Sequence, residues 1–482
     1  MSSLESRNAT LAPKVVWLCA LSLCYYGAVT IGDTVAQSVF VSRLGVGALP
    51  NIFLLKAGID VISGFLYLPL TQGRSPRRIW QVLLVFYAVV VAVGWWTSAG
   101  SGSDVGAYIL YAGHEVAWTL AVIHWGIFLL DVFSPAESRK LFPVLFGVGR
   151  LGALLGGLLV GSLAVPLGAN NLLWVAIALA LASAYASTRL GTSMPLRDVR
   201  SSIAKARRDA IASPLVRLIA LSTATMVMLR YGLRMVSLDE IRSAFDHDKD
   251  QVAAFLGLFS VVGNALAFVL GLYVVPRILA RLGVGAANLA YASSTVFAFL
   301  LTWLLPGLAT ASAARFVEMP LKHSLKTPLS VLFYGAEAPR IRIAARSVIF
   351  GVAIPVATVI AGLTFRELRT HLGLISVLGV VTSILYLGIC TWQNRAYGER
   401  LEHLLALELQ DAQPAPELEE RWKRQLESVA PKLGPIALNL SAKAFAADNE
   451  AMRSLALVML SEQLPHHLAS AIGRVTLQPD GG

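Results

Sequence analysis

Residues 191–213 read GTSMPLRDVRSSIAKARRDAIAS, a strongly basic segment and the longest polar interruption before the C-terminal tail. The rest of the chain is apolar: hydrophobic residues make up 56% of its 482 positions and charged residues only 14%, whereas about a quarter of a soluble domain is charged. Six apolar stretches precede the segment and six follow it, each near the length of about 20 residues that a spanning helix needs. The sequence therefore predicts an all-α integral membrane protein with twelve transmembrane helices in two six-helix halves.

The predicted spans use most of the chain. The first apolar run is too long for the core of a signal peptide and lacks a cleavage site of small residues, so we expect it to remain as a helix. The spans are predicted at residues 15–42, 49–72, 79–98, 104–133, 139–164, 168–190, 214–237, 250–275, 284–305, 308–334, 340–364 and 372–395.

The charges in the predicted loops indicate the orientation of the chain. Lys and Arg are retained on the cytoplasmic side of a membrane, and they concentrate in the loops on the side of residues 191–213. The opposite side carries only Arg43, Arg242, Lys249, Arg366 and Arg369. We therefore expect both termini in the cytoplasm, which requires an even number of spans, and a location in a bacterial inner (plasma) membrane.

Two halves joined by a cytoplasmic linker resemble the major facilitator superfamily, whose solute site lies at the midplane between the halves. On this interpretation the chain divides into a first six-helix half at residues 1–190, a linker at 191–213 and a second six-helix half at 214–396. Residues 397–482 form a helical cytoplasmic segment.

The tail from Tyr397 carries apolar residues at helical spacing with charges between them. Breaks near residues 411–416, 431–435 and 465 predict about four short helices, similar to a HEAT-like segment of about two repeats. Such a segment is a candidate binding surface for a cytoplasmic protein partner. A solvated extension without a partner is the alternative.

Several predicted spans contain ionisable residues, which cost about 3 kcal/mol each at the bilayer centre and therefore indicate function or pairing. The first span carries Asp33 on one face with Tyr26 and Gln37. Lys56 and Asp60 in the second span are four residues apart and can pair.

The fourth span contains Glu115 and Trp118, which we expect to face a cavity together. His124, farther along, lies about half a turn around the helix from Glu115. We expect His124 to make a structural hydrogen bond near the cytoplasmic end.

Basic residues dominate the seventh and tenth spans. Arg230 and Arg234 are four apart on one face, which a helix tolerates when an anion lies against them. In the tenth span four charged residues are predicted to share one face near the kink expected at Pro320; they are Arg315, Glu318, Lys322 and Lys326. This stripe lines either a water-filled cavity or an interhelical seam in which Glu318 pairs with Lys322.

Basic residues exceed acidic ones within the spans, which favours an anionic solute such as a phosphate or polycarboxylate. The basic set is Lys56, Arg150, Arg230, Arg234, Arg315, Lys322 and Lys326, and the acidic set is Asp33, Asp60, Glu115 and Glu318. The predicted solute-binding residues are Lys56, Arg230, Arg234, Arg315 and Lys322. The predicted gating or coupling residues are Asp33, Asp60, Glu115 and Glu318.

Other patterns exclude some classes of function. GVGRLG at residues 147–152 matches a dinucleotide fingerprint in letters only, because no strand precedes it. Gly152 with Gly156, and Gly157 with Gly161, instead favour close approach of helices. The chain has no ATP-binding P-loop, no arrangement of nucleophile and base, and three scattered cysteines. We therefore expect no enzyme, cofactor, metal site or nucleic-acid partner.

Residues 114–157, HEVAWTLAVIHWGIFLLDVFSPAESRKLFPVLFGVGRLGALLGG, resemble the ATP/ADP translocase (nucleotide transporter) branch of this superfamily. Glu115, Trp125 and the loop residues 139–143 occupy the places of that branch's motifs, and Lys56 and Asp33 match more weakly. The resemblance implies exchange of phosphorylated solutes, and some bacterial relatives carry HEAT-like tails. The sequence departs from the branch at Gly32, Val348 and residues 351–357, where the branch has a Lys, an acidic residue and a further Lys.

Three functional hypotheses remain from the sequence. The first is a secondary transporter that moves an anionic, phosphorylated or nucleotide-like solute by alternating access. The second is a receptor or scaffold that recruits a protein through the tail. The third is a proton-coupled exporter of amphipathic molecules, which leaves the basic excess unused.

Overall fold

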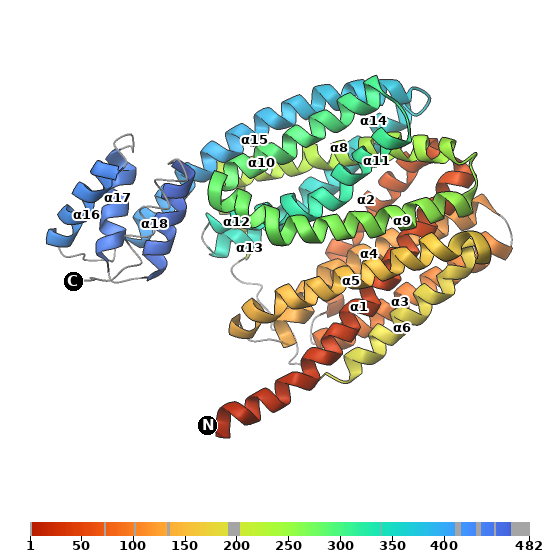
Figure 1. The fold of residues 1–482 in the computed structure, drawn as a ribbon, viewed down its shortest axis with the longest axis horizontal. Helices are drawn as coiled ribbons and strands as arrows, with labels where there is room; N and C mark the ends of the chain where they lie inside the picture. The colour runs from red at the N-terminus through yellow and green to blue at the C-terminus, as the bar shows by residue number, and fades with distance from the viewer. Residues whose placement is uncertain are drawn as a thin grey trace.

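The computed structural model describes residues 2–71, 74–100, 103–132, 135–190, 203–337, 339–409, 416–429, 435–447 and 450–463. Within these ranges the regular structure is helical throughout, as the sequence predicts. Figure 1 shows a bundle of long helices and, beside it, three short ones. The chain is an integral membrane protein, since nine helices of the described part are long and apolar enough to cross a bilayer.

The first half of the bundle holds six long helices. Their bounds, with those of the short turns between them, are α1 Ser2–Leu44, η1 Val46–Ala48, α2 Leu49–Thr71, α3 Pro76–Trp95, η2 Trp96–Gly100, α4 Asp104–Val132, α5 Pro135–Leu167, η3 Ala169–Leu172 and α6 Leu173–Thr188. A short helix, α7 Ile203–Ala212, follows within the predicted linker.

The second half contains more interruptions than the first. Its elements are α8 Pro214–Ala244, α9 Lys249–Val269, η5 Leu270–Val274, α10 Val275–Leu304, α11 Leu308–Phe316, η6 Val317–Lys326, α12 Thr327–Gly335, α13 Pro339–Val348, η7 Ile349–Ala353, α14 Ile354–Glu367 and α15 Leu372–Glu408. The elements η5, η6 and η7 are wider π-helical turns, which often occur at functional sites.

Local sequence signals account for several helix starts. Ser75 and Ser213 each accept a hydrogen bond from the backbone three residues on and are followed by Pro at the first helical position. Asp248 caps α9 by accepting from the backbone of Asp250 and Gln251. These caps begin α3, α8 and α9 at the connections between apolar stretches.

The tail forms the helices α16 Pro416–Val429, α17 Pro435–Ala446 and α18 Glu450–Gln463. The predicted first tail helix is not separate, because α15 continues without a break through residue 397 as far as Glu408. Apolar residues of the tail, including Leu405, Phe445 and Leu460, belong to the same buried cluster as Tyr291 and Phe333 of the second half. The tail is therefore packed against the bundle by a shared core.

The two halves are joined by apolar packing at one end of the bundle. We call this the distal end; it carries the connections at Gly45, Gly168, residues 245–248 and residues 368–371 and lies on the right in Figure 1, opposite the chain termini. The buried core of the first half extends there onto residues of the second half; these include Met235, Ile241, Leu256, Phe365 and Ile375.

Glycines allow α5 to approach two neighbours, as the small-residue spacing predicts. A Cβ on Gly152 would lie 2.2 Å from the Leu23 carbonyl oxygen of α1. A Cβ on Gly157 would lie 2.8 Å from the Gly257 carbonyl oxygen of α9, which belongs to the other half. The contact between α5 and α9 near the distal end is thus a contact between backbones.

The nine apolar helices coincide with nine of the predicted spans. The other three predicted spans, the second, fourth and tenth, correspond to α2, α4 and the run from α11 to α12. The tenth has four charged residues between Arg315 and Lys326, and parts of α2 and α4 lie outside the described side chains. Twelve spans therefore stay a prediction.

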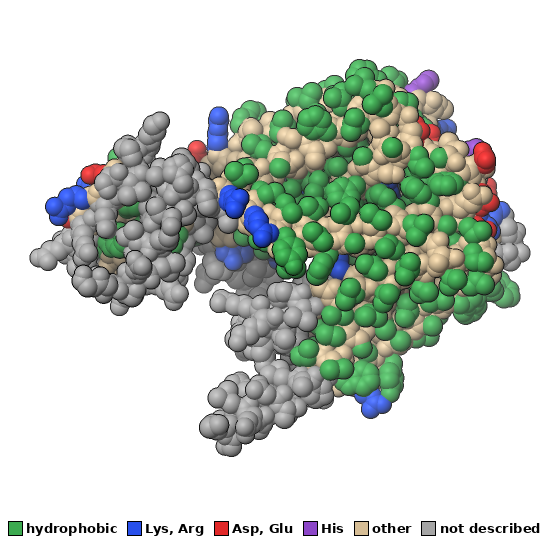
Figure 2. Space-filling model, viewed as in Figure 1, with side chains coloured by type: hydrophobic (Ala, Val, Ile, Leu, Met, Phe, Trp, Pro, Cys, Tyr) green, Lys and Arg blue, Asp and Glu red, His purple; other side chains and the backbone are tan. Residues whose placement is uncertain are grey.

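Side chains on the surface follow the expected pattern for a bilayer. Figure 2 shows hydrophobic side chains over the outer faces of the bundle, and on α9 these include Leu258, Val262 and Leu266, each about half exposed. In the same view Asp and Glu gather at the distal end, and Lys and Arg border the tail. The apolar surface is the part that lipid would cover.

Candidate functional site

The Glu318 carboxylate, 1% exposed, is surrounded by three arginines from two elements of the second half. Its Oε1 accepts from Arg230 Nη2 at 3.2 Å and from Arg234 Nη2 at 3.1 Å. Its Oε2 accepts from Arg315 Nη1 at 2.7 Å. The predicted pairing of Glu318 with Lys322 is wrong, since the arginines occupy both carboxylate oxygens.

Arg234 extends this cluster across the two halves. Its Nη1 donates to Glu115 Oε1 of α4 and to the Tyr111 hydroxyl, both at 3.1 Å. The Arg234 side chain is 10% exposed and that of Glu115 11%. A charge-assisted pair shielded in this way is stronger than a surface pair, so it contributes to holding α4 and α8 together.

A second contact between the halves joins Arg315 to α1. Arg315 Nη2 donates to Gln37 Oε1 at 2.7 Å, and Gln37 Nε2 donates to Asp33 Oδ1 at 2.6 Å. His114 Nε2 lies 4.0 Å from the same Asp33 oxygen. The predicted stripe of Asp33 and Gln37 on α1 is therefore connected to the arginine cluster.

Lys56 and Asp60 form the pair that their spacing predicts. Lys56 Nζ lies 2.9 Å from Asp60 Oδ2 and donates to Thr119 Oγ1 at 2.8 Å. Thr119 Oγ1 in turn donates to the Glu115 backbone carbonyl at 2.9 Å. The charge of Lys56 is thus neutralised inside the first half.

The π-helical turn η6 rearranges the predicted stripe of the tenth span. Pro320 lies inside this turn and has no backbone N–H to donate. A wide turn adds one residue relative to an α-helix, which rotates later side chains by about 100°. Lys326 consequently points into the second half, where Nζ donates to Asn288 Oδ1 at 2.7 Å beside the Phe333 and Tyr386 rings. The prediction that all four charged residues share one face is wrong for Lys326.

Two cations differ from the others because they are partly exposed and form no ion pair with a carboxylate of the described residues. The Lys322 side chain is partly exposed and makes no hydrogen bond or ion pair in the described part of the chain. Arg150 of α5, also partly exposed, donates from Nη1 to Asn264 Oδ1 of α9 at 2.9 Å. Both lie farther from the distal end of the bundle than the Glu318 cluster does.

Helix lengths indicate how deep each group lies. Glu115, Arg234 and Glu318 are ten or eleven residues from the distal ends of their helices, which is about 15 Å along an α-helix. Lys322 and Arg150 are 14 and 17 residues from the distal ends, or about 20 to 25 Å. The Glu318 cluster therefore lies between the distal end and the two unpaired cations.

The distal end itself is held shut by further contacts between the halves. The Ala169 backbone donates to Asp250 Oδ1 at 2.8 Å. A Cβ on Gly362 of α14 would lie 2.8 Å from the Leu54 side chain of α2. The bundle is therefore closed at its distal end by this packing and by the polar cluster next to it.

Aromatic side chains surround Trp118 in the first half. Its ring stacks on Tyr25 with centroids 5.9 Å apart and meets the Tyr26 ring edge-on at 6.4 Å. His124, predicted to be structural, contacts the Pro76 carbonyl through Nε2 at 2.6 Å. Trp118 thus belongs to an aromatic cluster next to Glu115.

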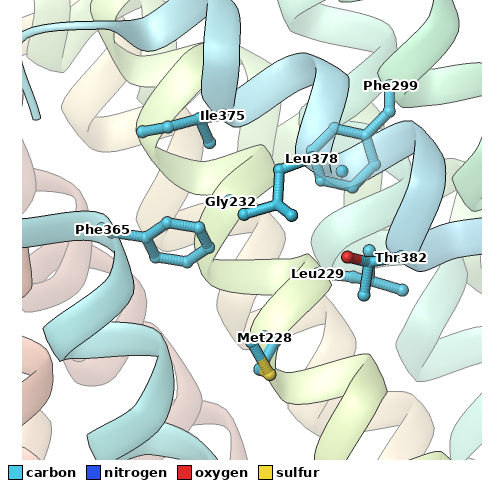
Figure 3. A pocket seen from close by; sticks show the side chains of 9 residues that line it. Met228, Leu229, Gly232, Phe299, Phe365, Ile375, Leu378 and Thr382 are labelled. Carbon is cyan, nitrogen blue, oxygen red and sulfur yellow. The ribbon is translucent and has the colours of Figure 1, made fainter. Parts of the chain in front are cut away.

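A pocket in the second half is separate from this charged region. It lies between α8, α10, α14 and α15 and is lined by Met228, Phe299, Phe365, Leu378 and other residues without charge (Figure 3). An apolar pocket of this kind offers nothing to neutralise an anion. We therefore place the candidate site among the charged residues between the halves.

The sequence analysis missed the neutral members of this region. Tyr111, Asn264 and Thr119 all make the hydrogen bonds given above, but Tyr, Asn and Thr occur in spans too often to be singled out. Asn264 was detectable as an amide in an otherwise apolar stretch of α9. Among the described residues no group of His, Cys, Asp and Glu could hold a metal ion.

No protein-family model matches the chain, and no curated protein matches it. Solved structures do resemble it. A mutant of the nucleoside transporter NupG has a TM-score of 0.61 at 12% identity, over 79% of this chain and 99% of that chain. An auto-inhibited POT family peptide transporter has a TM-score of 0.57 at 11% identity, over 80% and 97%.

A bacterial homologue of the iron transporter ferroportin, in an inward-facing state, has a TM-score of 0.56 at 12% identity, over 79% of this chain and 99% of that chain. At these identities the likeness shows the fold. The chain therefore shares the fold of these transporter structures.

Proposed function

We propose that this protein is a secondary transporter that moves an anionic, phosphorylated or nucleotide-like solute by alternating access. The observation that carries the proposal is the excess of positive charge between the halves, where Lys322 and Arg150 form no ion pair with a carboxylate of the described residues. Unpaired cations in a region of low dielectric attract anions. The solved structures that share this fold include a nucleoside transporter, a peptide transporter and a homologue of an iron transporter.

The contacts between the halves suggest how such a transporter works. The pairs Arg234 with Glu115 and Arg315 with Gln37 join opposite halves on the distal side of the unpaired cations. A solute bound to Lys322 is then separated from the distal end by these contacts. Opening that end requires both pairs to part, so Glu115 serves as a gating residue. Glu318 serves with it, because it holds Arg234 and Arg315 in position for these two pairs.

The proposal keeps the predicted solute-binding role of Arg230, whereas Arg234 and Arg315, also predicted to bind the solute, instead hold the cluster together. Arg230 is the cluster arginine closest to solvent, with 22% of its side chain exposed, so it can turn from Glu318 to a solute. Asp33, whose Oδ1 lies 4.0 Å from His114 Nε2, serves as a coupling residue. Lys56 and Asp60 act as a pair that the solute can separate, with Arg315 holding the cluster in place.

The wider architecture belongs to the same proposal. It comprises twelve spans, halves at residues 1–190 and 214–396 joined by 191–213, and both termini in the cytoplasm of a bacterial cell. Membership of the ATP/ADP translocase branch and a HEAT-like tail at residues 397–482 also remain proposals. The receptor or scaffold hypothesis is weakened because the apolar face of the tail packs on the second half.

Binding to the purified protein tests this function. We expect ATP, ADP, sugar phosphates or inorganic phosphate to raise the thermal unfolding temperature (Tm), because a ligand that binds only the folded state stabilises it. The matching uncharged nucleosides and sugars provide the comparison. The rise in Tm should vanish in Lys322→Ala and persist in Arg43→Gln, a variant of an exposed pair at the distal end.

The absence of any rise in Tm across the anion panel would overturn the proposal. A rise produced instead by lipophilic cations or amphipathic molecules would favour the exporter hypothesis. Uptake into proteoliposomes, with an opposing solute gradient or with a proton gradient, then distinguishes exchange from proton coupling.

A further inference from the structure

The seven basic residues of the spans fall into two groups. Four of them form ion pairs with carboxylates: Lys56 with Asp60, and Arg230, Arg234 and Arg315 with Glu318. A fifth, Lys326, is buried inside the second half and held by Asn288 between aromatic rings. Only Arg150 and Lys322 remain as cations that are partly exposed and lack a carboxylate among the described residues.

Arg150 is held in a defined position. Its Nη1 donates to Asn264 Oδ1 at 2.9 Å, and Asn264 Nδ2 donates to the Ser260 carbonyl at 2.8 Å. One of the five N–H groups of the guanidinium is therefore used. Tyr26 of the first half interacts electrostatically with Arg150, and the partly exposed side chain forms no ion pair with a carboxylate of the described residues.

Arg150 and Lys322 approach the same space from opposite halves. Gly263, next to Asn264, is so close to η6 that a Cβ there would lie 2.8 Å from Pro320 Cγ. Lys322 follows Pro320 by two residues. His323, the next residue in the sequence, interacts electrostatically with both Lys322 and Arg150.

We propose that Arg150 is the ligand that the first half supplies to a solute group carrying two negative charges, and that Lys322 binds the same group from the second half. This inference rests on the proposed function and adds a binding residue and a charge class to it. A phosphate monoester fits best, because a guanidinium can donate two parallel hydrogen bonds to its oxygens while an ammonium neutralises the second charge. A dicarboxylate shares the charge but not the tetrahedral shape.

The position of Arg150 also makes it sensitive to the solute during the transport cycle. Its hydrogen bond to Asn264 crosses from α5 to α9, two helices that belong to different halves. A rocking motion of the halves separates these helices. A dianion bound by both Arg150 and Lys322 replaces that contact, because it bridges the two halves. A monoanion whose single charge is neutralised by Lys322 forms no such bridge.

Phenyl phosphate and phenyl sulfate test the charge class, because they have the same shape and differ in charge. At about pH 8 the phosphate monoester is a dianion, since its second pKa is about 6, while the sulfate ester remains a monoanion. We expect the intact wild-type protein to bind phenyl phosphate about tenfold or more tightly than phenyl sulfate. Succinate serves as the dicarboxylate probe and should bind less tightly than phenyl phosphate.

Arg150→Gln should weaken the binding of phenyl phosphate at least tenfold more than that of phenyl sulfate, so that the preference is lost, and a thermal unfolding transition like that of the wild type shows that the variant is folded. Arg150→Lys should restore most of the preference. An Arg150→Gln protein that keeps the full preference would overturn the inference, as would a wild-type protein that binds both esters equally. If wild-type protein binds no anion of any kind, the proposed function fails as well, so the two failures are distinguishable.

Discussion

The Glu318 cluster and the Arg150–Lys322 region use the same kinds of residue but differ in charge balance. In the cluster, Glu318 and Glu115 accept from arginines, and Gln37 and Tyr111 use further N–H groups. In the deeper region, the cations have at most an amide partner among the described residues. Both regions lie between the halves, one toward the distal end and one farther inside.

This difference separates structural from binding roles. A buried charge that has lost its partner is strongly destabilising, whereas a buried charge with its partner in place avoids that cost. The cluster is complete without a solute, so it contributes to closing the distal end. The deeper region gains its missing charge only when an anion binds.

The largest effect is expected from Glu318→Gln. It leaves Arg230, Arg234 and Arg315 facing one another without their shared carboxylate. We expect a loss of about 3–5 kcal/mol in the free energy of unfolding. Thermal unfolding measures it, with Glu367→Gln at the exposed end of α14 as the control. A Glu318→Gln protein as stable as wild type would show that the cluster does not hold the closed bundle.

Gly157→Ala tests the backbone contact that accompanies the cluster. The added Cβ would lie 2.8 Å from the Gly257 carbonyl oxygen, so we expect a cost of about 2 kcal/mol from overpacking. Gly147→Ala on the same helix is the matched control variant, because its Cβ would make an ordinary 3.8 Å contact with Phe268. Equal Tm values for the two variants would contradict the inference that α5 and α9 are in close backbone contact near the distal end and are farther apart toward the middle of the bundle.

A double-mutant cycle with Arg234→Gln and Glu115→Gln isolates the pair that crosses the halves. Because the two side chains are in direct contact and largely buried, we expect a coupling energy of about 1 kcal/mol. Denaturant titration of the two single variants and the double variant gives this value. Additive effects would mean that Glu115 and Arg234 do not stabilise each other.

The smallest effect is expected from Lys322→Met without solute. Since the Lys322 side chain makes no hydrogen bond or ion pair in the described part of the chain, its removal should change the free energy of unfolding by less than about 1 kcal/mol, and a gain is as acceptable as a loss. The same variant should no longer be stabilised by anions. A large loss of stability in the absence of solute would place Lys322 with the structural charges.

Local spacing made part of the site predictable. Lys56 and Asp60 are four residues apart, so helix geometry alone brings them together, and they pair at 2.9 Å. The basic excess and the kink-forming Pro320 were also visible. The partners of Arg315 and Arg234 were not, because Gln37 and Glu115 lie 278 and 119 positions away and any of several spans can supply a partner.

The sequence by itself determined the membrane fold of this protein and the kinds of charge that its helices carry. The bilayer has no water to satisfy backbone groups, so long apolar runs must become helices wherever they occur. Only the tertiary structure decided which charges cancel: Glu318 pairs with three arginines, while Arg150 and Lys322 have no carboxylate among the described residues. Pairing depends on which helix faces are neighbours, and the ten-residue π-helical stretch η6 changes which face the later residues occupy.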